Sequence, residues 1–191
     1  MRNPLLRLFL LLSAMILILV GCGKDKLPVL MPAPDFHLED ADGKPVSFSD
    51  QNGKVRLVSF IYTNCTTVCP ATVHWMVKLQ DELKKENLFG SKVYLYNITF
   101  DPENDTGEVI KAYMKKWKMD PTGWAFLRGS VEDTGKAAAD FGVLVQKVEN
   151  DFIHTDRIFL VDGKGEVRKT YVGSRLNLPE VLKDMKDLVN E

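Results

Sequence analysis

Apolar residues follow two different periods along this chain, and segments with the two periods alternate. Residues 55–62 and 93–100 are almost continuously β-branched or aromatic, which is typical of strands buried on both faces of a sheet. Each run is followed by apolar residues at helical spacing. The first helical segment begins at Pro70 and the second covers residues 107–118. This alternation predicts a sheet covered by helices on both faces.

The same patterns predict the two ends of the domain. Apolar and polar residues alternate on either side of Asp42-Gly43, which predicts an N-terminal β-hairpin. No repeat or second linker interrupts the chain, so we expect one domain of class α/β, with a central mixed sheet flanked by helices. The remaining predicted elements are a helix at 131–141, strands at 143–148, 158–162 and 167–172, and a helix from Pro179.

The first two dozen residues do not fit this globular pattern. Arg2 and Arg7 precede an apolar stretch at residues 8–20, and no acidic residue occurs before Asp25. A charged start followed by an apolar centre is the layout of a secretory signal. The stretch is shorter than the roughly 20 apolar residues that a spanning helix needs. Leu19-Val20-Gly21-Cys22 resembles the lipobox of bacterial lipoproteins, which implies cleavage before Cys22 and lipidation of its sulfur.

We therefore expect three parts: a lipoprotein signal peptide at residues 1–21, a tether at 22–34 and a globular domain at 35–191. The tether contains three prolines, which favour an extended chain. An uncleaved anchor helix is the alternative to the lipid. Either arrangement places the domain outside the cytoplasm and beside a membrane, and the lipid places it on the extracytoplasmic face of the cell membrane.

The charge of the chain excludes one class of partner. The formal net charge is -1. Cleavage before Cys22 removes Arg2 and Arg7 and no acidic residue, so the mature charge is -1 minus 2, or -3. A weakly acidic domain lacks the basic footprint of a nucleic-acid-binding protein. We expect no nucleic-acid partner.

The number and positions of the cysteines limit the kinds of site that the protein can have. If Cys22 carries lipid, only Cys65 and Cys69 remain, and two cysteines in an exported protein do not make a disulfide scaffold. With Pro70 at the start of a helix, Cys69 lies near the helix cap and Cys65 in the preceding loop. The positive end of the helix dipole then favours thiolates. Because Cys65 lies in a loop, the two sulfurs can approach each other. The pair is therefore a structural disulfide, a redox couple or a metal site, and the spacing alone does not choose among these three.

One of the three histidines is predicted to lie near the cysteines. We expect His37 to be an ordinary hairpin residue and His74, beside Trp75, to be a packing or solvent residue. His154 lies in a predicted loop just before the strand at 158–162. In a thioredoxin-like sheet that loop reaches the mouth of the cysteine site, so His154 is the predicted third ligand.

From Ala33-Pro34-Asp35-Phe36 to the C-terminus, the chain resembles the Sco/SenC family of thioredoxin-fold copper proteins. The residues that carry the resemblance are TNCTTVCP at 63–70, TFDPENDT at 99–106, and His154 ahead of a Phe-Leu-Val-Asp strand. The resemblance implies copper ligands at Cys65, Cys69 and His154. It also implies that Asp101 is a site neighbour or a docking residue, while a helix cap before Pro102 is the alternative for Asp101.

Members of this family assist assembly of the binuclear copper centre of cytochrome c oxidase. The resemblance therefore implies a copper chaperone rather than an enzyme, which meets the copper-bearing subunit of the oxidase. Thiolates are soft ligands that select Cu(I), while a nitrogen ligand lets the same site keep Cu(II). Zinc would also accept these three ligands with a water, but structural zinc prefers four protein ligands.

Two other functions are alternatives. A metal-free thiol–disulfide oxidoreductase would reduce the cysteines of the oxidase copper site. Against it, the spacing is Cys-x-x-x-Cys rather than Cys-x-x-Cys, and no proline stands beside His154. A peroxiredoxin is less favoured still, because Tyr62 stands where that family's motif has its proline.

Overall fold

A computed structural model describes residues 26–149 and 151–191, so the predicted signal peptide and Cys22 lie outside the described residues. The helices and strands are β1 (Met31–Pro32), β2 (His37–Glu39), β3 (Pro45–Ser47), η1 (Phe48–Gln51), β4 (Val55–Ile61), α2 (Cys69–Lys85), β5 (Val93–Thr99), α3 (Gly107–Trp117), β6 (Trp124–Leu127), α4 (Val131–Asp140), β7 (Val145–Val148), β8 (Asp151–His154), β9 (Ile158–Val161), β10 (Glu166–Tyr171), η2 (Gly173–Arg175) and α5 (Leu178–Val189).

The central sheet has six strands in the order β1-β10-β9-β4-β5-β6. β4 and β5 pair in parallel from Val55↔Val93 to Ile61↔Thr99, and β6 continues parallel to β5. β9 pairs antiparallel to β4 on its other side, so the sheet is mixed, as predicted. Parallel neighbours need a crossover connection, which α2 supplies between β4 and β5. Every residue of β4 is buried, as expected for a strand covered on both faces.

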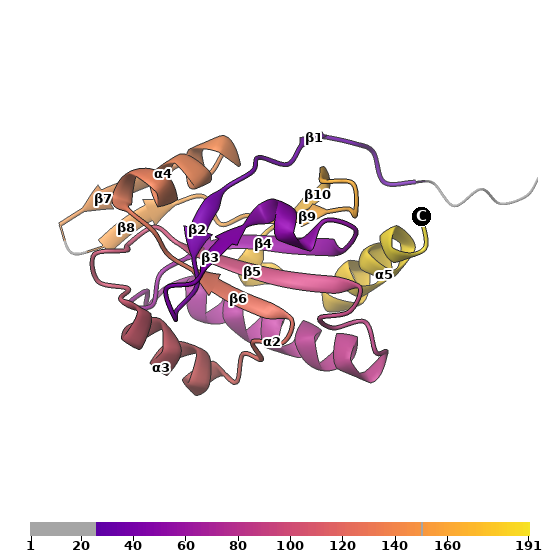
Figure 1. The fold of residues 1–191 in the computed structure, drawn as a ribbon, viewed down its shortest axis with the longest axis horizontal. Coiled ribbons are helices and arrows are strands. Elements are labelled where there is room, and N and C mark those ends of the chain that lie inside the picture. Colours follow the sequence, from indigo (N-terminus) through magenta and orange to yellow (C-terminus); the bar gives the residue numbers. More distant parts are fainter. Residues whose placement is uncertain (1–25, 150) are drawn as a thin grey trace, which may run out of the picture.

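Helices cover both faces of this sheet, as the sequence pattern predicted. Figure 1 shows α2 and α3 below the sheet and α4 above it, and α5 packs against α2. Successive residues of β4 point to opposite faces. Ser59 Oγ lies 3.5 Å from Met76 Sδ of α2, whereas the ring of Phe60 lies 5.6 Å from that of Phe141 at the end of α4. The core therefore forms two layers, one on each side of β4.

Three strands were not predicted. β1 has two residues, which is too short for a period to be recognised. β6 is an apolar run without β-branched residues, which periodicity does not distinguish from a buried helix segment. β8 occupies part of the segment that we expected to be a loop before the strand at 158–162. It pairs with β7 in a separate two-stranded sheet, with Val145 opposite His154. His154 therefore lies at the end of a strand rather than in a loop.

The described part of the predicted tether is extended and lies along one edge of the sheet. Leu30 N donates to Val167 O at 2.8 Å, and Ala33 N donates to Gly165 O at 2.7 Å. The buried Arg168 guanidinium donates to Leu27 O at 3.1 Å and to the Asp162 carboxylate at 2.8 Å. The chain thus joins the domain along β10.

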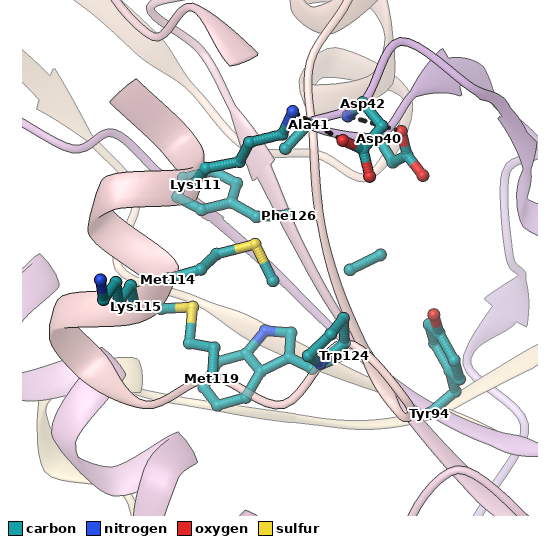
Figure 2. A pocket seen from close by; sticks show the side chains of 12 residues that line it. Asp40, Ala41, Asp42, Tyr94, Lys111, Met114, Lys115, Met119, Trp124 and Phe126 are labelled. Atoms are coloured by element: carbon teal, nitrogen blue, oxygen red, sulfur yellow. Dashed lines mark hydrogen bonds and ion pairs between the residues drawn. The ribbon is translucent and has the colours of Figure 1, made fainter. Parts of the chain in front are cut away.

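A cavity of about 480 Å³ lies at the opposite edge, beside β6. Figure 2 shows Met114 of α3, Met119 and Trp124 around it, with Lys111 and Asp42 joined at one end by an ion pair of 2.6 Å. Neither Cys65, Cys69 nor His154 lines this cavity. Within residues 26–149 and 151–191, no helix has the length and apolar character needed to cross a membrane.

Candidate metal centre

Helix α2 begins at Cys69, one residue before the start predicted at Pro70. Pro70 lies in the first turn, where its missing N–H leaves no helical hydrogen bond unmade. The preceding residue, Val68, has no side-chain oxygen to cap the helix. Instead, Sγ of Cys65 accepts a hydrogen bond from the backbone N–H of Cys69 at 3.4 Å. A sulfur atom therefore takes the place of the usual N-cap acceptor, at the positive end of the helix dipole.

Cys65, Cys69 and His154 converge in the structure. One ligand atom from each lies within 4.8 Å of the other two, and Cys69 Sγ lies 4.0 Å from His154 Nε2. Both cysteines are buried and free. His37 and His74 are not members of this group: His37 contacts Ser47 across the β2–β3 hairpin, and His74 packs beside Trp75. The fold thus brings together the three side chains that the sequence predicted as ligands.

The two sulfurs are not equivalent. The hydrogen bond from the Cys69 thiol, supported by His154 and the Thr67 hydroxyl, holds the pKa of Cys65 far below that of an ordinary thiol, although burial opposes this. The same hydrogen bond, together with burial, raises the pKa of Cys69. Burial lowers the pKa of His154, but its hydrogen bonds to Cys65 and to the Thr155 carbonyl outweigh burial and raise it. The reduced pair therefore holds one thiolate and one thiol.

A buried carboxylate holds the loop that carries Cys65. Asp105 is fully buried, and both of its oxygens accept from the backbone N–H of Thr63 at 3.2 Å. The hydroxyls of Thr63 and Thr99 donate to it as well. Burial raises the pKa of Asp105 and these donors oppose the shift. Asp105 thus ties the loop after β4 to the end of β5. Asp105 was not predicted as a site residue, because its bonds to Thr63 join residues 42 positions apart in the chain.

Asp101 makes local contacts. Its buried carboxylate accepts from Asn104 Nδ2 at 3.0 and 2.9 Å, and its backbone N–H donates to Thr99 Oγ1 at 2.9 Å. These bonds close the turn that leads toward α3. Asp101 is not a member of the Cys65–Cys69–His154 group, and its expected role as a site neighbour or docking residue stays a prediction.

A cluster of aromatic side chains lies beside the imidazole. The ring of Phe100 lies 4.8 Å from that of His154 and 5.2 Å from that of Phe152. Tyr62 packs on both phenylalanines, with ring centroids 5.1 Å apart in each case. Its hydroxyl donates to the carboxylate of Asp151, and burial followed by this bond raises the pKa of Tyr62. This cluster was not predicted, because its members come from three separate segments of the chain.

Comparison with known proteins agrees with this arrangement. The model of the SCO1/SenC family matches residues 29–190. The chain belongs to the SCO1/SenC family. Its thioredoxin-like fold is shared with a SCO1/SenC family lipoprotein from Bacillus anthracis str. Ames. That structure has 37% sequence identity and a TM-score of 0.78, over 85% of this chain and 98% of that one.

Two further SCO1/SenC relatives with solved structures are described in terms of a disulfide or of copper. BsSco, a member of the Sco family of cytochrome c oxidase assembly proteins, was described as having a disulfide switch. It is 31% identical, with a TM-score of 0.76 over 86% of this chain and 98% of that one. ScoI of Bradyrhizobium japonicum was solved with copper bound. It is 28% identical, with a TM-score of 0.70 over 82% of this chain and 99% of that one.

Replacing Asp105 tests its role in holding the site. Asp105→Ala leaves the buried donors of Thr63 and Thr99 without an acceptor, so the free energy of unfolding should fall by about 2–3 kcal/mol. Chemical denaturation measures this. The control is Asp42→Ala, which removes an exposed aspartate paired with Lys111 and should cost less than about 1 kcal/mol. Equal losses in the two variants would contradict the role given to Asp105.

The inequivalence of the sulfurs predicts selective alkylation of the reduced protein. Because the pKa of Cys65 is lowered, its thiolate fraction should hardly change as the pH rises from about 6 to 8, whereas an ordinary cysteine gains roughly 80-fold. Iodoacetamide at the lower pH should therefore label Cys65 well ahead of Cys69, as read by peptide mass spectrometry. Equal labelling of both sulfurs at that pH contradicts the assignment.

Proposed function

We propose that this protein is a copper-binding assembly factor that delivers copper to the binuclear copper site of cytochrome c oxidase, or enables its insertion there. Cys65, Cys69 and His154 hold the copper as cargo. The observation that carries the proposal is the convergence of their three ligand atoms within 4.8 Å. The copper found in ScoI and the assembly role given to the Sco family support it.

The donor set suits copper that must be passed on. Two thiolates select Cu(I), and an imidazole adds the harder donor that Cu(II) accepts. The Cys65 sulfur is already a thiolate, and the Cys69 thiol must lose its proton to become a second anionic ligand. Three ligands leave part of the coordination shell to an incoming ligand from the acceptor. A closed four-ligand shell would instead favour permanent retention.

The free and inequivalent cysteine pair favours a second candidate function, reduction of a disulfide in the copper site of the oxidase. The Cys65 thiolate would attack that disulfide, forming a mixed disulfide and expelling one target thiolate. Cys69, after losing its proton, would then attack Cys65 and release the second target thiolate. The target gains two electrons, one proton from Cys69 and one proton from solvent, and the Cys65–Cys69 pair ends as a disulfide. The disulfide switch described for BsSco supports such a cycle.

We place this activity outside the cytoplasm, with a signal peptide at residues 1–21, a lipid on Cys22, a tether at 22–34 and the copper-binding domain at 35–191. The Bacillus anthracis lipoprotein of the same family supports this layout. Arg168 holds the carbonyl of Leu27 against the domain. From Cys22 to Leu27 a fully extended chain reaches at most about 18 Å. The lipid would therefore keep the β10 edge of the sheet near the membrane surface.

Removing the imidazole tests copper binding. His154→Ala should weaken Cu(II) binding by more than about tenfold and change its absorption spectrum, since even residues that only support a ligand contribute 10–100-fold. Cu(I) should be affected much less, because two thiolates alone satisfy it. Competition titrations measure both affinities. His74→Ala is the matched control, a histidine outside the ligand group. An unchanged Cu(II) affinity and spectrum in His154→Ala would favour the reductase.

Changing the lipobox cysteine tests the anchor. Cys22→Ser removes the sulfur that would accept the lipid, so the protein should stay unprocessed or be released from the membrane fraction. Metabolic labelling with a radioactive fatty acid, followed by fractionation, measures this. Cys69→Ser should be labelled and retained like the unaltered protein. Normal labelling of Cys22→Ser would rule out lipidation at this site.

A further inference from the structure

The imidazole of the proposed copper site is carried by a hairpin that has no strand neighbour in the central sheet. β7 and β8 pair only with each other among the described strands. Figure 1 shows this hairpin beside α4, at the end of the molecule opposite α5. The two cysteines lie instead at the junction of buried β4 with α2. The distance from His154 to the sulfurs thus depends on how the hairpin is held against that junction.

One polar contact makes this connection directly. The hydroxyl of Tyr62 donates to Oδ1 of Asp151, and the two residues are 89 positions apart in the chain. Tyr62 follows β4, is only 3% exposed and lies in the same turn as Cys65. Asp151 begins β8, the strand that ends at His154. The bond therefore joins the segment that holds the cysteines to the strand that carries the histidine.

The other contacts of the hairpin are less able to fix its position. Lys147 and Glu103 form an ion pair at 3.4 Å, but their side chains are 60% and 66% exposed, so the pair contributes little. Phe152 packs on Tyr62 and Phe100. Ring packing brings the hairpin close but tolerates sliding, whereas a hydrogen bond to a charged acceptor is directional. Of these contacts, the hydrogen bond from the Tyr62 hydroxyl is thus the directional one that joins the hairpin to the segment of the cysteines.

We infer that Tyr62 is a positioning residue for the third copper ligand: its hydrogen bond to Asp151 keeps the β7–β8 hairpin closed, so that His154 stays over Cys65 and Cys69. The inference rests on the proposed copper function. A closed hairpin keeps the imidazole available to Cu(II). An open hairpin leaves the two sulfurs, which suit Cu(I) and its release. The bond therefore governs how long Cu(II) is retained and leaves Cu(I) affinity nearly unchanged.

The test uses Tyr62→Phe, which removes the hydroxyl and keeps the ring in the aromatic cluster. Tyr94→Phe is the matched control, a tyrosine that lines the cavity beside β6. Cu(II) dissociation into a chelator should be about tenfold faster in Tyr62→Phe, because one charge-assisted hydrogen bond no longer holds the hairpin. Hydrogen exchange of the β7 and β8 amides should also be faster in the metal-free protein, where copper binding plays no part. Tyr94→Phe should change neither.

A double-mutant cycle separates this contact from a general loss of stability. Asp151→Ala should accelerate Cu(II) dissociation as Tyr62→Phe does, and the double variant should be no faster than either one. Additive effects, or a Tyr62→Phe variant with unchanged dissociation or unchanged exchange, overturn the inference. Failure of the copper proposal itself is distinguishable. His154→Ala would then leave Cu(II) binding unchanged, whereas exchange in metal-free Tyr62→Phe still reports whether the hydroxyl holds the hairpin.

Discussion

The hydrogen bond from the backbone N–H of Cys69 to the sulfur of Cys65 fixes the geometry on which the rest of the site depends. It satisfies the backbone N–H of the first residue of α2, a helix that has no capping side chain of the usual kind. It also places one sulfur at the positive end of the helix dipole, which stabilises negative charge there. Asp105 serves the same junction from the other side, since it binds the backbone of Thr63 and thereby holds the loop that delivers Cys65.

The resulting charge asymmetry serves both proposed functions. A lone thiolate at Cys65, beside a protonated Cys69, is the arrangement that a nucleophile for disulfide exchange needs. For metal binding the same pair supplies one anionic ligand at once, and a second only when the Cys69 proton leaves. The two activities therefore share their sulfurs and cannot be carried out at the same moment. What separates them chemically is the imidazole, which would bind the metal directly but in disulfide exchange only supports the Cys65 thiolate.

Sequence reasoning reached much of this structure, and its failures have physical causes. The buried runs that became β4 and β5, and the helix start at Cys69, follow from local periodicity and capping, so they were predictable. β6 was missed because its apolar run has no β-branched residue, and periodicity does not distinguish such a run from a buried helix segment. The partners of Tyr62 and Asp105 were missed for a different reason. Hydrogen bonds between residues far apart in sequence depend on strand register, which no local pattern encodes. Family resemblance could name the three ligands, but not the contacts that hold them.

The proposed ligands belong to parts of the fold that differ in rigidity, and this difference implies an order in which they would release a bound copper ion. The two sulfurs belong to the junction of a strand buried on both faces with its helix, whereas His154 ends a strand of a separate hairpin. Elements with fewer buried contacts open at lower free energy, so the imidazole would leave a bound ion before either sulfur does. An ion left on two thiolates is in the environment that Cu(I) prefers. Opening of the hairpin would also expose that ion on one side, where a thiolate or imidazole of an acceptor could reach it without first displacing a sulfur.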